Sequence, residues 1–405
     1  MDAPAYQKST RIMSKESKEE LDYILNHLGE ERENYHGATV PPIFQTSNFI
    51  FPSVDAFSRA FTDEYAHHLY TRGNNPTVRI LCDKLAALER TPDAMVFPSG
   101  MAAIAMAVMS FVKAGDHILC IRNPYSWTSK LLLDYLPRFG ISVDFFEGNN
   151  IDELNALVTP ATKMLIVESP NTMTFDVVDL RAIGEWCRSH DILSLIDNSY
   201  ASPLYQNPFE LGIDLVCHSG TKYLNGHSDV VFGVVCGSEE HMERIRHWGM
   251  MTLGSTMSPF EASMVIRGLR TLKVRLAKIS DTTSKVFHFL EAQDWVEQVY
   301  YPFDPNSNQY ELAKSQMKAA PGLISFVLKT TEEGKIQRFI EGLKYFKMAV
   351  SWGGHESLII PLMAIHKAHP DQEHVHSSSF IRIYIGLEDE EALIGDLQNA
   401  SKYLN

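Results

Sequence analysis

The residues best suited to chemistry gather around one lysine, Lys222, in the run Cys-His-Ser-Gly-Thr-Lys-Tyr-Leu-Asn-Gly-His-Ser-Asp. The apolar residues 215–217 predict a strand that brings this lysine to the edge of a sheet, where open α/β sheets bind their ligands. A lysine that forms a Schiff base with a carbonyl cofactor needs surroundings that lower its pKa, and a phosphate needs several donors. Ser219 and Thr221 place two hydroxyl groups beside the amine. A strand-to-loop turn that binds nothing is the alternative for this segment alone.

Two segments upstream of Lys222 complete a pattern typical of a cofactor site. Asp197 ends the apolar run 193–196, where a carboxylate can pair with a protonated pyridine nitrogen and keep that ring an electron sink. Capping of a turn is the alternative role for this residue. Gly100 and Met101 follow a short apolar segment and open an apolar helix, whose first N–H groups suit a phosphate. Together these features predict pyridoxal 5′-phosphate (PLP) as the cofactor.

Taken together, these motifs resemble the Cys/Met-metabolism family of PLP-dependent enzymes, also called the cystathionine γ-synthase-like family of fold type I. The string HSGTKYLNGHSD, downstream of DNSYASPLYQNP, carries the resemblance, which extends from Gly37 to the C-terminus. The family includes cystathionine γ-synthase, cystathionine γ- and β-lyases, methionine γ-lyase and O-acylhomoserine sulfhydrylases. Membership implies a fold type I architecture and an amino-acid substrate.

The resemblance implies a role for each residue around the cofactor. Lys222 matches the Schiff-base lysine, which also moves protons, and Asp197 matches the partner of the pyridine nitrogen. Tyr125 matches the tyrosine that stacks on the cofactor ring and takes part in proton transfer, a role that suits a pKa lowered by cationic surroundings. The matching phosphate site consists of Ser219, Thr221 and the backbone N–H groups of Gly100 and Met101.

Tyr70 and Arg72, in Tyr-Thr-Arg-Gly-Asn-Asn-Pro-Thr, match family residues that reach the phosphate of a neighbouring subunit. An arginine can hold a phosphate through two parallel charged hydrogen bonds. The match implies a homodimer with shared active sites, and family members are typically tetramers. An ordinary loop is the alternative for this motif taken alone.

The substrate site is implied by residues near the C-terminus. Arg382 matches the arginine that binds the substrate α-carboxylate, and an arginine on an apolar strand is costly to bury without such a partner. Ser351 and Trp352 belong to the same carboxylate-binding region. The sequence departs from the family where Thr172 replaces an asparagine that contacts the cofactor ring, and Asn171 is the residue that could replace this contact.

We predict a carbon–sulfur lyase that acts on cystathionine or methionine by α,β- or α,γ-elimination. Val350 is typical of methionine γ-lyase-like members, whereas Trp352 and Thr172 favour cystathionine β-lyase, and the large Trp127 could narrow the pocket. A γ-replacement enzyme, such as cystathionine γ-synthase or O-acylhomoserine sulfhydrylase, is the alternative. A PLP aminotransferase and an inactive PLP-fold binding protein are more distant ones. The sequence does not choose between the sulfur amino acids.

The elements that must position these residues alternate between strand and helix from about Ala94, which predicts βαβ units and a mostly parallel central sheet. We therefore expect an α/β fold with a smaller C-terminal α/β domain, where residues 349–351 are one of the predicted strands. The predicted divisions are an N-terminal arm and dimer-contact segment (1–60), a large PLP-binding domain (61–265) and a small domain (266–405). Further strands are predicted at 117–121, 142–146, 193–197 and 215–218.

Composition excludes several other classes of function. The 405 residues carry a formal net charge of −14, which argues against a nucleic-acid or anionic-membrane surface. The five cysteines are scattered, form no CxxC pair and predict no metal site. The N-terminus lacks the apolar core of a signal peptide, and no apolar stretch reaches the length of a membrane span. We therefore expect a cytoplasmic protein with reduced cysteines.

Overall fold

A seven-stranded sheet forms the centre of the molecule. The computed structural model describes residues 18–148, 150–371 and 374–404. Within them the strand order is β1-β7-β6-β5-β4-β2-β3, and the five strands from β6 to β3 run parallel, whereas β7 is antiparallel to both of its neighbours. The strands are β1 (Asp93–Phe97), β2 (His117–Ile121), β3 (Ser142–Phe146), β4 (Thr162–Glu168), β5 (Leu193–Asp197), β6 (Leu215–His218) and β7 (Gly233–Gly237).

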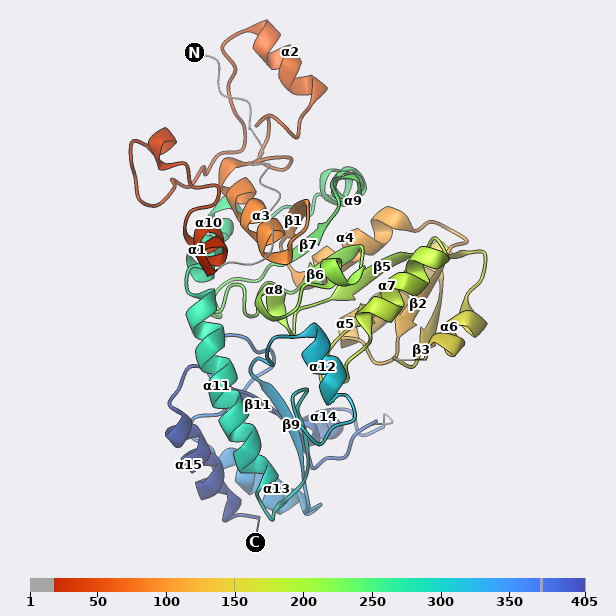
Figure 1. Ribbon diagram of the computed structural model, residues 1–405, viewed down its shortest axis with the longest axis vertical. Coiled ribbons are helices and arrows are strands. Elements are labelled where there is room, and N and C mark those ends of the chain that lie inside the picture. Colours follow the sequence, from red (N-terminus) through yellow and green to blue (C-terminus); the bar gives the residue numbers. More distant parts are fainter. Residues whose placement is uncertain (1–17, 149, 372–373, 405) are drawn as a thin grey trace.

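The apolar character of these strands explains their place in the sheet. Most of their residues are buried, as expected for strands that are covered on both faces. The helices α4 (Gly100–Phe111) and α7 (Leu180–Ser189) connect strands and pack against the sheet (Figure 1). The predicted mostly parallel sheet is confirmed, with the bounds of β2, β3, β5 and β6 as expected.

A second sheet lies in the C-terminal part of the chain, in the order β10-β11-β12-β9-β8. All of its pairings are antiparallel except β10 with β11. The predicted strand at 349–351 is wrong: the strand ends at Met348, and Ser351 has left-handed backbone geometry with a φ of 81°. The strands are β8 (Val296–Tyr300), β9 (Leu323–Leu328), β10 (Lys347–Met348), β11 (Leu358–Pro361) and β12 (Phe380–Tyr384).

The long helix α11 (Leu272–Glu291) joins the two parts of the molecule, as Figure 1 shows. Leu276 near its start packs in the core beneath the first sheet, and Phe287 near its end packs in the core of the second. Within the described residues no helix is long and apolar enough to cross a membrane. The predicted domain boundary after residue 265 falls inside α10 (Pro259–Leu269), and the division into domains stays a prediction.

The N-terminal segment is only partly packed against this body. Residues 1–17 of the predicted arm lie outside the described residues. Helix α1 (Lys18–Asn26) contacts α3 (Pro76–Glu89), whereas α2 (Val54–Thr62) projects well beyond the rest of the chain (Figure 1). Ile50 is 98% exposed and Val54 83% exposed. An apolar projection of this kind is typical of a contact with another polypeptide.

Candidate active site

Three neighbouring parallel strands end at the same edge of the central sheet. Glu168 at the end of β4 is paired in register with Asp197 at the end of β5, and Asp197 is paired with Cys217 of β6. Lys222 follows β6 after a short loop. The sequence thus correctly predicts that Asp197 and the Lys222 loop meet beyond the carboxyl ends of the strands.

The Lys222 amine lies in a mostly buried position against the C-terminal part of the chain. Its Nζ donates a hydrogen bond to Oγ of Ser351 at 2.9 Å and lies 5.4 Å from the centre of the Trp352 ring. Burial lowers the pKa of Lys222 to about 8; Arg382 acts in the same direction and Asp197 opposes it. The amine is therefore much more often neutral than an ordinary lysine near pH 8, as a nucleophile or a proton acceptor requires.

The segment that carries Ser351 is packed closely against the lysine backbone. Gly353 has a φ of 91°, and a Cβ atom added to it would lie 2.7 Å from Cα of Lys222. Trp352 is buried and its ring centre lies 5.2 Å from that of Tyr223. Ser351 and Trp352 thus hold Lys222 in place, a contact that the sequence did not predict.

The predicted phosphate donors come together from two distant segments. Ser99 caps α4 by accepting the N–H of Ala102 at 3.0 Å, and the first N–H groups of the helix, at Gly100 and Met101, have no carbonyl partner within it. A Cβ atom at Gly100 would lie 2.8 Å from Cβ of Ser219, so only glycine allows this approach. The Ser219 hydroxyl has no hydrogen-bond partner among the described residues.

The Thr221 hydroxyl is engaged elsewhere. Its Oγ1 donates to the carbonyl of Phe232 at 3.2 Å and accepts the N–H of Phe232 at 3.0 Å. The side chain therefore ties the Lys222 loop to the chain before β7. This arrangement gives Thr221 a structural contact that its place in the motif did not reveal.

Asp197 is linked to the phosphate donors through a residue that sequence reasoning missed. Oδ1 of Asp197 accepts the N–H of Ser199 at 2.9 Å and its hydroxyl at 2.5 Å. Oγ of Ser199 in turn accepts the N–H of Ser219 at 2.6 Å. The turn contact that we gave as the alternative role of Asp197 is therefore present, and it uses one carboxylate oxygen. The Asp-Asn-Ser run is the signal that could have identified Ser199.

Tyr125 and Glu168 are joined at the entrance of the site. The Tyr125 N–H donates to Oε2 of Glu168 at 2.7 Å, and the tyrosine side chain is 41% exposed. Burial raises the pKa of Tyr125, and the carboxylates of Asp197 and Glu168 add to this effect, so the expected lowering by cationic neighbours is not found. Burial, and to a lesser extent the charge of Asp197, raises the pKa of Glu168 to about 8. Glu168 was not among the predicted residues, although it lies only four positions before Thr172, where the sequence departs from the family.

Arg382 is a buried cation without an ion pair among the described residues. Its Nη1 donates to the carbonyl of Thr172 at 3.2 Å and lies 4.0 Å from Sδ of Met173. Burial lowers the pKa of Arg382 to about 10, and Glu168 and Tyr223 oppose this shift. A buried guanidinium that contacts only a carbonyl and a thioether is suited to receive an anion.

The loop after β4 does not support the replacement contact proposed for Asn171. Its Oδ1 accepts the backbone N–H groups of Met173, Thr174 and Phe175, and its Nδ2 donates to the side chains of Thr174 and Asp176. The Asn171 side chain is therefore committed to shaping its own loop.

Tyr70 and Arg72 lie together but separately from the other predicted residues. Both are exposed, and the Arg72 guanidinium lies 5.5 Å from the centre of the Tyr70 ring. Within the described residues no hydrogen bond, ion pair or ring contact joins either of them to Lys222, Asp197 or Ser219. One chain alone therefore does not bring the whole predicted set together.

The chemistry of this set fits a phosphorylated pyridine aldehyde. A lysine with a lowered pKa can bind an aldehyde, a carboxylate at a strand end can face a ring nitrogen, and a helix N-terminus with a free hydroxyl can bind a phosphate. The family model for the Cys/Met metabolism PLP-dependent enzymes matches residues 23–402. The chain belongs to this family. The predictions of the family, of a PLP-dependent enzyme and of a fold type I architecture are therefore confirmed.

Known relatives in this family match the chain over almost its whole length. The L-methionine gamma-lyase of Pseudomonas deceptionensis is 38% identical over 93% of this chain and 96% of its own. Human cystathionine gamma-lyase is 35% identical over 93% of this chain and 92% of its own. The crystal structure of metB from Corynebacterium glutamicum superposes with a TM-score of 0.87 at 31% identity, and covers 95% of this chain and 98% of that one.

Replacement of Gly353 by alanine is expected to destabilise the protein. The added methyl group meets the Lys222 backbone, and the left-handed geometry disfavours any side chain, which together cost about 2 kcal/mol. Gly395→Ala is the matched control, because nothing lies within 4 Å of its Cβ position in α15 (Glu390–Ser401). Thermal unfolding of both variants checks this; equal unfolding temperatures would contradict the close packing at Gly353.

Covalent capture of PLP by the apo-protein should depend on pH through the Lys222 amine. Only the neutral amine attacks an aldehyde, so we expect the rate to rise with pH and to level off above about 8. Because the positive charge of Arg382 lowers the pKa of Lys222, the midpoint should move to higher pH in Arg382→Leu. Stopped-flow absorbance measures both curves. A wild-type midpoint near the value of about 10.4 for a free lysine would contradict the buried site.

Proposed function

We propose that this chain is a PLP-dependent carbon–sulfur lyase that eliminates the sulfur-bearing group of an amino acid such as methionine or cystathionine. The observation that carries the proposal is the pairing of Lys222, an amine with a lowered pKa, with Arg382, a buried cation that makes no ion pair among the described residues. The first group suits proton transfer at Cα, and the second suits the α-carboxylate of an amino acid. Curated relatives named methionine and cystathionine gamma-lyases support elimination, with departure from Cγ as the favoured form.

Each residue has a role in this proposal. When bound, PLP supplies the electron sink for the electrons that remain when the α-proton leaves. Lys222 holds the cofactor in the resting enzyme, then accepts and returns the proton, and Ser351 orients its amine through the 2.9 Å hydrogen bond. Asp197 uses its second oxygen for the pyridine nitrogen. The phosphate would be held by Ser219 and the N–H groups of Gly100 and Met101, whereas Thr221, predicted as a further donor, is already bonded to Phe232 and fixes the loop.

Tyr125 and Arg382 act on the substrate side of the site. Arg382 binds the α-carboxylate and so orients the Cα–H bond toward Lys222. Tyr125 covers the cofactor ring; because the pKa of the Tyr125 hydroxyl is raised, the group serves as a proton donor rather than as a base. Trp352 packs in the core beside Tyr223, whereas Trp127 and Val350 are exposed.

The lyase proposal predicts specific products. With L-methionine, the holoenzyme should release 2-oxobutanoate, ammonia and a thiol; with cystathionine, it should release a keto acid, ammonia and a thiol amino acid. Lys222→Ala should lose this turnover and also the visible absorbance of the bound cofactor. Colorimetric detection of keto acid and thiol checks both. The accumulation of a thioether from an O-acylhomoserine, with no keto acid from any sulfur amino acid, would favour a γ-replacement enzyme instead.

We also propose that the enzyme is a homo-oligomer, with Tyr70 and Arg72 completing the phosphate site of a second copy. The exposed pair lies on the segment between α2 and α3, and α2 projects from the body (Figure 1). The side chains of Val54, Phe57 and Phe61 on α2 are apolar and exposed. A second copy that covers this segment would bury those side chains and bring a guanidinium to the phosphate. A dimer with shared sites, paired into a tetramer, is the assembly that we propose.

A complementation experiment tests the shared site. Arg72→Ala and Lys222→Ala should each be inactive alone, but a mixed dimer carries both defects in one site and neither in the other. Co-expression of the two variants should therefore restore about a quarter of the wild-type sites. Keto-acid release by the co-purified mixture, with light scattering to measure its mass, checks this. No activity above that of the separate variants would place the whole site within one chain.

A cytoplasmic location is the remaining part of the proposal. All five cysteines are free and buried, and none is paired with another. Reduced cysteines are the usual state in the cytosol, where small-molecule thiols keep them so. Burial raises the pKa of several of these thiols, including Cys120 and Cys217, which further limits their reactivity.

A further inference from the structure

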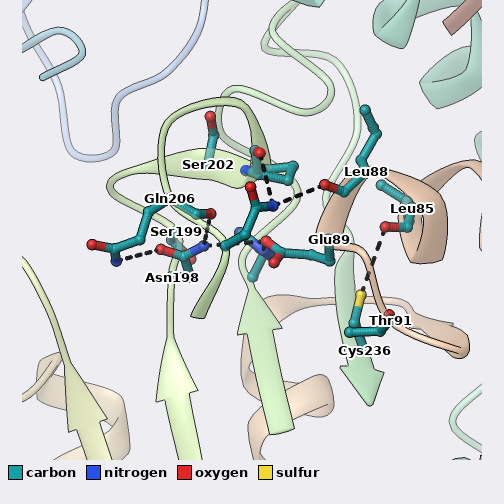
Figure 2. Close-up of polar contacts among 12 residues, drawn as sticks. Leu85, Leu88, Glu89, Thr91, Asn198, Ser199, Ser202, Gln206 and Cys236 are labelled. Carbon is teal, nitrogen blue, oxygen red and sulfur yellow. Dashed lines mark hydrogen bonds and ion pairs between the residues drawn. The ribbon is translucent and has the colours of Figure 1, made fainter. Parts of the chain in front are cut away.

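A buried polar network lies beneath the strand ends that carry the candidate site. Its centre is Glu89, the last residue of α3, whose side chain is almost fully buried. Figure 2 shows Glu89 pointing from α3 toward Asn198. Oε1 of Glu89 accepts a hydrogen bond from Nδ2 of Asn198 at 3.1 Å and lies 2.5 Å from Nε2 of His218. Both partners are buried as deeply as Glu89 itself.

The partners of Glu89 are sequence neighbours of candidate cofactor residues. Asn198 directly follows Asp197 at the end of β5. His218 ends β6 and directly precedes Ser219. A single carboxylate oxygen therefore joins the two strand ends that carry the candidate partners of the pyridine nitrogen and the phosphate.

Gln206 extends this network to a third strand end. Its Nε2 donates to Oδ1 of Asn198 at 2.9 Å and to the carbonyl of Ser169 at 3.0 Å. Ser169 directly follows Glu168 at the end of β4. The side chains of Glu89 and Gln206, which lie outside the sheet, thus connect the ends of β4, β5 and β6.

The network is incompletely satisfied. Oε2 of Glu89 and Oε1 of Gln206 are buried and have no hydrogen-bond partner among the described residues. A buried carboxylate oxygen without a partner lowers stability, and an apolar residue at the same place would avoid that loss. Buried polar atoms without a hydrogen-bond partner occur most often at functional sites, where side chains must be held in one geometry.

We propose that Glu89 is a positioning residue for PLP, which fixes the spacing between Asp197 and Ser219 through its contacts with Asn198 and His218. The cofactor ring is rigid, so its nitrogen and its phosphate can be bound together only if the two strand ends keep that spacing. The inference rests on the cofactor roles given above to Asp197 and Ser219. It assigns a function to a residue that touches neither the cofactor nor the substrate.

The test measures the affinity of the full-length apo-protein for PLP. In Glu89→Gln one oxygen of the carboxylate becomes an N–H₂ group and the negative charge beside His218 is lost, so the strand ends are no longer held by a charged acceptor. We expect the Kd for PLP to rise about tenfold or more, as for other outer residues that orient ligands. Titration by absorbance gives the Kd, and thermal unfolding of the apo-protein gives the stability.

Asn207→Ala is the matched control. Nδ2 of Asn207 donates to the carbonyls of Leu88 and Pro203 at 3.0 and 3.1 Å, beside Glu89, and within the described part of the chain its side chain makes no hydrogen bond to Asn198 or His218. This variant loses two buried hydrogen bonds at the same helix end, and its Kd for PLP should stay within about twofold of wild type. A wild-type Kd in Glu89→Gln, or losses of affinity in both variants that follow their losses of stability, would overturn the proposal.

The variant His218→Gln keeps the test decisive if Glu89→Gln folds poorly, and a double-mutant cycle extends the test where both variants fold. His218→Gln removes the same contact from the other side and should raise the Kd for PLP similarly, and the double variant should be little worse than either single one. Additive losses would overturn the proposal. Since no turnover is measured, an unchanged Kd in the variants refutes only this inference, whereas a wild-type protein that binds PLP but eliminates nothing refutes the proposed lyase.

Discussion

The exclusion of water from the Lys222 amine is the constraint on which the site depends. An amine in water is protonated at neutral pH and neither attacks an aldehyde nor accepts a proton. The protein removes water by packing residues 351–353 of the C-terminal part onto a loop of the N-terminal part, so that both halves of the chain are needed to set one pKa. Arg382 on β12 contributes to the same shift and comes from the second sheet. The function therefore requires that the two sheets stay docked.

Three charged groups of the site, Asp197, Glu168 and Arg382, act on one another. Asp197 and Glu168 end neighbouring strands, and the charge of Asp197 adds to the burial that raises the pKa of Glu168. Arg382 counters Glu168 but is itself held in a place where burial disfavours its charge. In the proposed function, the positive and negative groups of the site are already apart before a zwitterionic amino acid binds. The substrate carboxylate would then meet Arg382 without the reorganisation that water requires.

Much of the fold and of the site is predictable from the sequence, for definable reasons. Strands that are buried on both faces leave continuous apolar runs, so β2, β5 and β6 could be bounded correctly; β3, a partly exposed strand at the sheet edge, was also bounded as expected. Lys222 and Asp197 stand directly after such runs, where parallel sheets place their ligands. Contacts between distant segments leave no comparable pattern: Ser351 reaches Lys222 only because Gly353 allows the chains to touch. The sequence did not identify Glu89 for the same reason: its partners are distant in the chain, and a glutamate at a helix end normally indicates a solvated surface. The direction of the Tyr125 pKa shift was also wrong, because the groups beside it are carboxylates.

The length of helix α3 is restricted because functional residues lie at or near both of its ends. It begins at Pro76, four positions after Arg72, and it ends at Glu89 beneath the strand ends. Its 14 residues span about 21 Å, and a one-residue insertion would rotate Glu89 by about 100° away from Asn198. None of the 14 residues is exposed and ten of them are buried, so substitutions in α3 are restricted as well as insertions and deletions. In the evolution of this chain, α3 is therefore a segment in which residue types and residue count are both held nearly constant.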